Sequence, residues 1–140
     1  RYPDLDVFMF GTSKLNEKVP GLKKYIRDAS TIDTVKIYNS VSVFMCSSIN
    51  EGYGLTGMEA MACGAALATT EYSAVYEYAI KQENALLSPV KDPGAMVRNI
   101  CRLFDDENER YRIAKNGVCS LEKFSWDIAI TKFVSAMEQR

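Results

Sequence analysis

The segment VSVFMCSSINEGYGLTGMEAMACGAALAT, which spans residues 41–69, decides the fold that this sequence predicts. Residues 41–46 are rich in β-branched and aromatic side chains and have the length of a central strand. A polar turn with several glycines follows, and residues 55–63 then have the apolar spacing of a helix that ends at Gly64. Residues 65–69 are another short apolar run. The segment therefore predicts a strand, a turn, a helix and a second strand.

The same alternation continues in both directions along the chain. Residues 5–10 and 22–26 have the pattern of strands upstream, and residues 85–88 have it downstream. Because the strands are apolar on both faces, we expect a parallel sheet with helices on each side. The predicted fold class is α/β, with a Rossmann-like parallel sheet flanked by helices.

Helices are expected between the strands and after the last one. Their boundary signals are a capping box at residues 30–33, a serine at the start of residues 73–80, Asp92-Pro93, a Gly117 stop after residues 107–116, and Ser125 before the last helix. Apolar spacing predicts three buried helix faces, made by Leu55, Met58 and Ala62, by Met96, Ile100 and Phe104, and by Ile128, Phe133 and Met137.

The composition indicates one globular domain over residues 1–140, with 47% hydrophobic and 25% charged residues. A formal charge of −1 provides no general attraction to nucleic acid, so no nucleic-acid partner is expected. No stretch approaches the roughly 18–20 apolar residues that cross a bilayer, so direct membrane insertion is not expected either. The chain begins at Arg1 rather than at a methionine, and we expect it to be a fragment of a longer protein.

The sequence contains no histidine, which excludes a histidine-activated nucleophile and a histidine-ligated zinc site within this chain. Its four cysteines, Cys46, Cys63, Cys101 and Cys119, show no close pairing. Three of them stand in apolar runs, where a small buried residue suffices. A reducing compartment fits this usage, and a cytoplasmic location is expected.

The glycine turn has the features of an anion-binding site. In an open parallel sheet, ligands bind beyond the carboxyl ends of the strands, where the following helix points free amides at them. Gly52 and Gly54 remove side chains there, so a diphosphate can approach the backbone amides of Tyr53, Gly54, Leu55 and Thr56. The Thr56 hydroxyl offers one more donor.

Two carboxylates flank this turn, Glu51 before it and Glu59 one helical turn past its end. Carboxylates repel a diphosphate, so they suit the neutral, hydroxyl-bearing ends of a nucleotide sugar. We expect Glu51 to meet the transferred sugar and Glu59 to meet the ribose diol. Spacing alone also permits a simpler interpretation, in which both glutamates are solvated and the glycines only form the turn.

At these residues the sequence resembles the retaining glycosyltransferases of family 4, whose donor-binding half carries two glutamates with seven residues between them around Gly-Phe-Gly-Leu. Glu51 and Glu59 match that register. The likeness extends over nearly the whole chain, through residues 41–48, Met58 to Gly64, Asn84 to Ser88, Lys91-Asp92-Pro93 and Phe124-Ser125-Trp126.

The resemblance implies the C-terminal half of a GT-B fold, lacking its first strand. It implies that Glu51 contacts the donor sugar, that Gly52 to Thr56 surround the diphosphate and that Glu59 binds the ribose, with no metal or other cofactor. A missing N-terminal half would bind a glycan or lipid-linked acceptor, in polysaccharide or glycoconjugate biosynthesis. The parent enzyme would then work near the cytosolic face of a membrane.

Two positions depart from the family pattern: Tyr53 replaces the commoner phenylalanine, and Thr56 stands where proline is frequent. The basic pair that neutralises the diphosphate in the family belongs to a segment before residue 1. The chain alone is therefore expected to bind donors weakly, if at all, and to transfer nothing.

The sequence also allows two other functions. Gly52-Tyr53-Gly54-Leu55-Thr56-Gly57 fits the dinucleotide fingerprint, with Glu71 after the next strand, which would indicate an NAD(P)-dependent oxidoreductase. Against it, Ser47 to Glu51 separate the strand from the first glycine. A non-catalytic binding module that keeps the fold is the remaining alternative.

Overall fold

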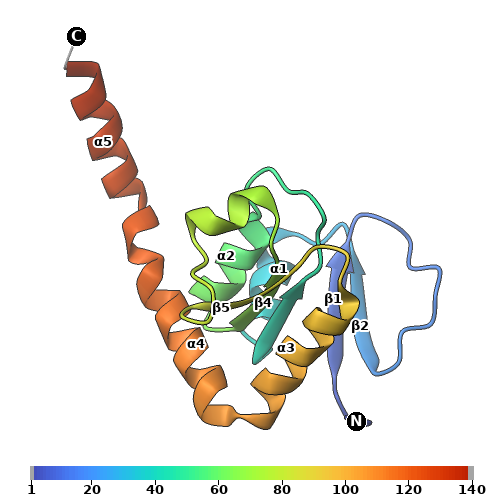
Figure 1. The fold of residues 1–140 in the computed structure, drawn as a ribbon. Coiled ribbons are helices and arrows are strands. Elements are labelled where there is room, and N and C mark those ends of the chain that lie inside the picture. The colour runs from blue at the N-terminus through green and yellow to red at the C-terminus, as the bar shows by residue number, and fades with distance from the viewer. Residues whose placement is uncertain (1, 139–140) are drawn as a thin grey trace.

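The computed structural model describes residues 2–138, which form an α/β body with one helix extending from it (Figure 1). The strands are β1 (Val7–Gly11), β2 (Leu22–Arg27), β3 (Val43–Cys46), β4 (Ala66–Thr70) and β5 (Ala85–Ser88). The α-helices are α1 (Thr31–Tyr38), α2 (Leu55–Ala62), α3 (Pro93–Asp105), α4 (Glu107–Ser120) and α5 (Trp126–Glu138). Two short 3-10 helices, η1 (Ser73–Glu77) and η2 (Glu122–Phe124), complete the structure.

All strand pairs are parallel, as predicted, but the strands form two sheets rather than one. β1 pairs with β2, while β3, β4 and β5 form a second sheet in that order. No pairing joins β1 to β3 within residues 2–138, so each has an edge without a strand partner. The two sheets meet through side chains instead, since the ring of Phe10 on β1 stacks on Phe44 of β3 at 6.2 Å.

Helices cover both faces of the three-stranded sheet, which confirms the predicted layering. Leu67 and Leu87 point to one face and pack with Met61 of α2 and the buried residues around η1. Ala66, Ala68 and Leu86 point to the other face and pack with α3 and α4. All five residues of β4 are buried, so β4 is the centre of the core.

Local signals placed several helix ends correctly. Ser30 and Asp33 form the predicted capping box of α1, since the Ser30 hydroxyl accepts from the Asp33 amide and the Asp33 carboxylate accepts from the Ser30 amide. Asp92 caps α3 with Pro93 in its first turn. The Ser125 hydroxyl accepts from the Ile128 amide at the start of α5.

Two helix predictions were wrong in their extent. The segment 73–80 forms only η1, a 3-10 helix that ends at Glu77, and Ser73 does not cap it. The Asn84 side chain accepts from the Ile80 amide and donates to the Tyr78 carbonyl, which holds residues 78–80 outside a helix. Gly117 does not end α4, which continues to Ser120; Gly117 is buried there against Met61 of α2.

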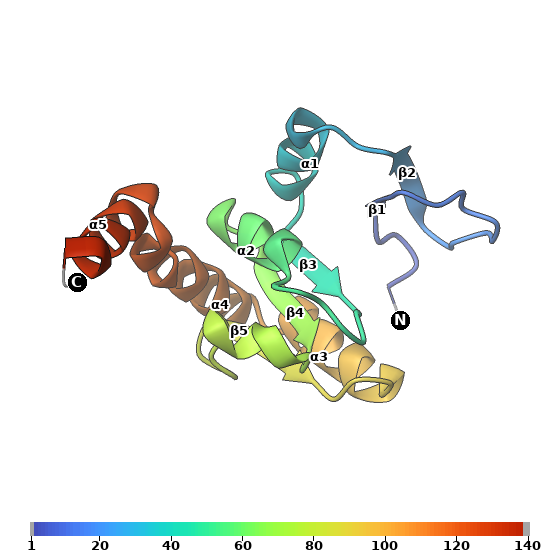
Figure 2. The ribbon, with the colours of Figure 1, turned by 90° about the horizontal axis from the view of Figure 1, so that it is seen from above.

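The face predicted to be buried on α5 is exposed. Phe133 is 67% exposed and Met137 is 58% exposed, and none of the described residues of α5 is buried. Figures 1 and 2 show why: α5 extends past the end of α4, away from both sheets. No helix among residues 2–138 is long and apolar enough to span a membrane.

Candidate functional site

The predicted site lies in the connection between β3 and α2, at the carboxyl end of β3 (Figure 2). β3 ends at Cys46, and α2 begins at Leu55. The predicted order of strand, glycine turn and helix is therefore confirmed. Residues 47–54 have no helix or strand of their own, so side chains from neighbouring elements must fix their positions.

Glu51 is held in place by contacts that reach back to β4. Its Oε1 accepts a hydrogen bond of 2.6 Å from the Ser48 hydroxyl. The Ser48 carbonyl in turn accepts from the hydroxyl of Thr70, the last residue of β4. Glu51 is half-buried, so its carboxylate sits at the sheet edge rather than out in solvent.

Glu59 is supported from a different element. Its Oε2 accepts a 2.9 Å hydrogen bond from the hydroxyl of Tyr38, the last residue of α1. Burial, and then the hydrogen bond to Glu59, raise the pKa of Tyr38 above its ordinary value. The phenol therefore stays protonated and acts as the donor, while the exposed Glu59 carboxylate accepts.

The start of α2 leaves backbone donors free. Gly54 is the N-cap residue and has φ +82°, and no side chain caps this end of the helix. The first helical hydrogen bond runs from the Gly57 amide to the Gly54 carbonyl. Across the described residues, the amides of Leu55 and Thr56 donate to no protein acceptor. They add to the partial positive charge of the helix start and are available to an anion.

The glycines of the turn do not all serve the purpose that the sequence suggested. A Cβ on Gly54 would overlap the hydroxyl of Tyr72, and a Cβ on Gly57 would lie 2.6 Å from the hydroxyl of Tyr78. Both glycines are thus required because the two tyrosine hydroxyls leave no space for a Cβ. Only at Gly52 does no atom lie within 4 Å of an added Cβ, so this is the position where the missing side chain leaves open space.

A buried pair of tyrosines supports the turn from beneath. The hydroxyls of Tyr72 and Tyr78 share a hydrogen bond, and Tyr78 also donates to the Gly54 carbonyl at 3.3 Å. Both residues are 1% exposed, and burial raises the pKa of each. The pair therefore remains neutral and fixes the peptide that precedes the free amides.

The predicted buried face of α2 was wrong at Leu55 and Ala62, which are exposed, whereas Met58 packs partly buried against the core. Leu55 is 61% exposed, and Gly57, Ala60 and Met61 are the buried residues. The small residues Gly57 and Ala60 let α2 lie close to the sheet, and Met61 enters the core beside them. Tyr53 is also partly exposed, with its ring centroid 6.3 Å from that of Tyr78.

The positioning residues around the site were missed by sequence reasoning. They are Tyr38, Ser48, Thr70, Tyr72 and Tyr78. Tyrosines inside otherwise apolar segments were the available signal, because a buried phenol needs a hydrogen-bond partner. Which partner it takes depends on the packing of elements distant in sequence.

The described residues also bear on metal binding and on dinucleotide binding. No three histidine, cysteine or carboxylate side chains of residues 2–138 are grouped to hold a metal ion. The independence from cofactors stays a prediction. Glu71, the acid that a dinucleotide site would require, forms a 2.6 Å ion pair with Lys81 instead.

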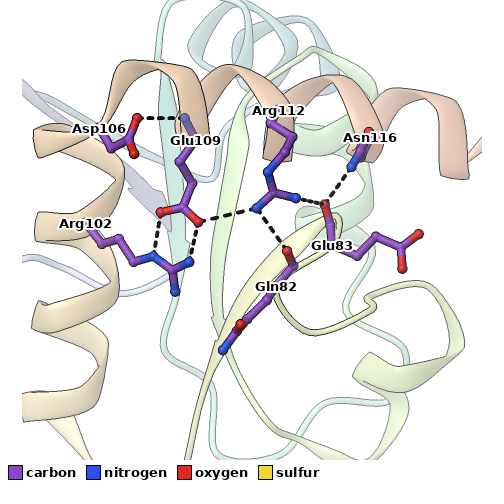
Figure 3. A network of polar contacts seen from close by, with 7 residues as sticks. All are labelled: Gln82, Glu83, Arg102, Asp106, Glu109, Arg112 and Asn116. Atoms are coloured by element: carbon purple, nitrogen blue, oxygen red, sulfur yellow. Dashed lines mark hydrogen bonds and ion pairs between the residues drawn. The ribbon is translucent and has the colours of Figure 1, made fainter.

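An open groove of about 1060 Å³ lies elsewhere, between α3 and α4, and none of the predicted site residues lines it. Three of its charged side chains, Arg102, Glu109 and Arg112, are paired with one another (Figure 3). Glu109 accepts from both Arg102 and Arg112, and Arg112 also donates to the carbonyls of Gln82 and Glu83. Asn116 donates to the Glu83 carbonyl as well, so this network fastens the loop before β5 to α4. We assign it a packing role.

The arrangement of the elements is that of the C-terminal domain of GT-B glycosyltransferases. The structure superposes on sucrose-phosphate synthase from Thermosynechococcus elongatus with a TM-score of 0.76, at 24% identity, over 83% of this chain and 29% of that one. It superposes on Anabaena HepE, solved in complex with UDP-glucose, with a TM-score of 0.75, at 17% identity, over 86% of this chain and 34% of that one. At these identities the likeness establishes the fold.

Residues 1–106 match the family of glycosyl transferases group 1, and the chain belongs to this family. A D-inositol 3-phosphate glycosyltransferase of Corynebacterium efficiens is 27% identical over 103 residues, which is 74% of this chain. The match covers 24% of that relative, so the chain spans about a quarter of its length.

Proposed function

We propose that this chain is the donor-binding part of a retaining glycosyltransferase, which moves a sugar from a nucleoside diphosphate sugar to an acceptor hydroxyl. One observation carries the proposal. Two separately supported carboxylates flank an open turn whose helix-start amides have no acceptor among the described residues. HepE, which shares the fold, binds UDP-glucose, and this supports a ligand of the same kind here.

Each part of the site then has one role in the reaction. The free amides of Leu55 and Thr56, with the space at Gly52, would receive the diphosphate. As the bond to the sugar breaks, negative charge grows on that diphosphate, and oriented amides stabilise it without having to reorganise. Glu51 would hold the hydroxyls of the sugar, while Glu59 would hold the ribose. No group on this chain needs to attack the sugar itself.

The acceptor and the remaining catalytic groups would come from outside the chain. Within residues 2–138, β1 and β3 each have an edge without a strand partner, which supports the missing first strand that the family resemblance implies. The basic pair missing from this chain would follow that strand. The acceptor would be a glycan or a lipid-linked glycan, and the enzyme would act in the cytoplasm at or near a membrane.

The roles of the two glutamates separate in a pair of conservative variants of the enzyme that contains this chain. We expect Glu59→Gln to weaken nucleotide affinity about tenfold, because a charge-assisted hydrogen bond to the ribose is lost. Glu51→Gln should leave nucleotide affinity unchanged and lower the transfer rate by about tenfold or more. Isothermal titration with the nucleoside diphosphate and a sugar-transfer assay measure the two effects.

Glu122→Gln is the matched control, since Glu122 is an exposed carboxylate of η2, outside the β3–α2 turn. It should behave as the unmodified enzyme in both assays. Normal binding and normal turnover in both Glu51→Gln and Glu59→Gln would refute the assigned roles.

A further inference from the structure

We propose that Tyr38 is a positioning residue for ribose recognition: its buried hydroxyl holds Oε2 of Glu59 and leaves Oε1 as the acceptor for the ribose hydroxyls. The inference rests on the proposed function, and it adds a residue of α1 to a site otherwise built from the β3–α2 turn. Recognition of the ribose would then depend on where α1 lies.

The position of the Tyr38 hydroxyl is fixed by aromatic packing. Tyr38 is 1% exposed, and its ring meets those of Phe10 and Phe44 edge-on, with centroids 5.7 and 5.3 Å away. These rings come from β1 and β3, so three elements set where the phenol points. Because the Tyr38 ring is packed on two sides, it cannot move to follow Glu59. The Glu59 side chain must therefore adopt the conformation that reaches the Tyr38 hydroxyl.

Glu59 is the mobile partner of this pair. It is exposed, and a glutamate on a helix surface ordinarily populates several rotamers. The 2.9 Å bond from Tyr38 selects the rotamer that brings Oε2 to the phenol. In the described part of the chain no other side chain donates to the Glu59 carboxylate, so Tyr38 alone selects it.

The chemistry of the pair suits a diol. A carboxylate accepts about four hydrogen bonds, and the phenol occupies one of these sites. Because burial and the bond to Glu59 raise the pKa of Tyr38, the phenol donates at any physiological pH. The carboxylate therefore has one acceptor site occupied by a fixed donor, and its remaining lone pairs can accept from two adjacent hydroxyls.

A simpler interpretation is that Glu59 only satisfies a buried phenol. The two interpretations differ in one measurable respect. If Glu59 merely serves Tyr38, removing the Tyr38 hydroxyl leaves the discrimination between nucleotides with and without ribose hydroxyls unchanged. If Tyr38 positions Glu59 for the ribose, that discrimination falls.

The test uses the enzyme that contains this chain and ligand-observed NMR with UDP, ADP and GDP, each paired with its 2′,3′-dideoxy form. For the nucleotide that binds best, we expect the unmodified enzyme to prefer the ribose form by about tenfold. Tyr38→Phe should reduce the preference by about threefold to tenfold, with the affinity for the dideoxy form unchanged. Glu59→Gln should abolish the preference.

Tyr25→Phe is the control, since Tyr25 donates to the Ser13 carbonyl on a different part of the surface. It should keep the preference of the unmodified enzyme. A second measurement covers the case in which Tyr38→Phe does not fold. In the enzyme labelled with 3-fluorotyrosine, the ¹⁹F resonance of Tyr38 should shift more with the ribose nucleotide than with its dideoxy form.

The outcomes distinguish the proposed role of Tyr38 from the proposed donor site on which it depends. If Glu59→Gln abolishes the preference while Tyr38→Phe retains it, or if Tyr38→Phe weakens both forms equally, the role of Tyr38 is refuted and the donor site stands. Equal ¹⁹F shifts with the two forms would refute that role as well. If the unmodified enzyme binds none of the three nucleotides at millimolar concentration, or shows no preference for ribose, the donor site itself is refuted.

Discussion

The two sides of the glycine turn differ in why a glycine is needed there. On the outer side, a side chain at Gly52 would meet no atom within 4 Å. On the inner side, Gly54 and Gly57 face the hydroxyls of Tyr72 and Tyr78, which lie too close to leave space for a Cβ. In this short motif, packing requires glycine at positions 54 and 57, whereas at position 52 glycine leaves space for a ligand. The sequence shows these as one pattern, and substitution can separate them.

The largest effect is expected on the inner side, at Gly54→Ala. Alanine at φ +82° costs about 1–2 kcal/mol in backbone strain, and overpacking against Tyr72 adds about 1–3 kcal/mol. Urea unfolding should show a loss of about 2–5 kcal/mol. Adding Tyr72→Phe should recover little, because the ring carbon Cζ remains 2.7 Å from the new Cβ. A loss below about 1 kcal/mol would contradict the assignment of Gly54 to packing.

Gly57→Ala should have a smaller effect that can be rescued. The new Cβ would lie 2.6 Å from the Tyr78 hydroxyl, while the next atoms are at an ordinary 3.5 Å. Overpacking of about 1–3 kcal/mol is partly offset by the better helix propensity of alanine, about 1 kcal/mol. Adding Tyr78→Phe removes the close atom. In a double-mutant cycle the pair should therefore lose less stability than the sum of the single changes, and additive losses would argue against the contact.

Tyr78→Phe alone measures how much the buried pair of Tyr72 and Tyr78 contributes to the free energy of unfolding. It removes the bond to the Gly54 carbonyl and leaves the Tyr72 hydroxyl without its partner. A loss of about 0.5–1.5 kcal/mol is expected in thermal or urea unfolding. Tyr76→Phe is a suitable control, because Tyr76 lies on η1 with its side chain exposed. Equal losses from the two variants would mean that the buried pair has no special role.

Gly52→Ala, on the outer side, should change stability least and binding most. With open space around the Cβ and no left-handed backbone, the free energy of unfolding should stay within about 0.5 kcal/mol. If the diphosphate occupies that space, the methyl group should weaken nucleotide affinity by about tenfold, or about 1.4 kcal/mol. Titration with a nucleoside diphosphate measures this. Unchanged affinity would remove the distinction between the two sides.

The parts of the fold that the sequence predicted are those decided by neighbouring residues. The capping box of Ser30 and Asp33, the Asp92-Pro93 start of α3 and the order of strand, turn and helix around Glu51 all follow from local chemistry. The positions of Glu51 and Glu59 on either side of the turn follow in the same way.

The parts that could not be predicted depend on what covers a surface. Apolar spacing marked α3 and α5 alike, yet Met96 of α3 is buried while Phe133 of α5 is exposed. Periodicity identifies an apolar face but does not supply its partner. The supports of the site were missed for the same reason. Glu59, which accepts from Tyr38, and Gly54, whose carbonyl accepts from Tyr78, stand 21 and 24 residues away from them in sequence.

The division of the strands into two sheets bears on how the molecule opens. β4 shares backbone hydrogen bonds with a strand on each side, whereas β1 and β2 bond only to each other within residues 2–138. Cooperative units that share few contacts open independently and at lower free energy. Amide protons of the β1–β2 pair should therefore exchange with deuterium well before those of β4. Phe10 on β1 packs against the ring of Tyr38. Each such opening would therefore briefly free that ring to move and weaken its hydrogen bond to Glu59.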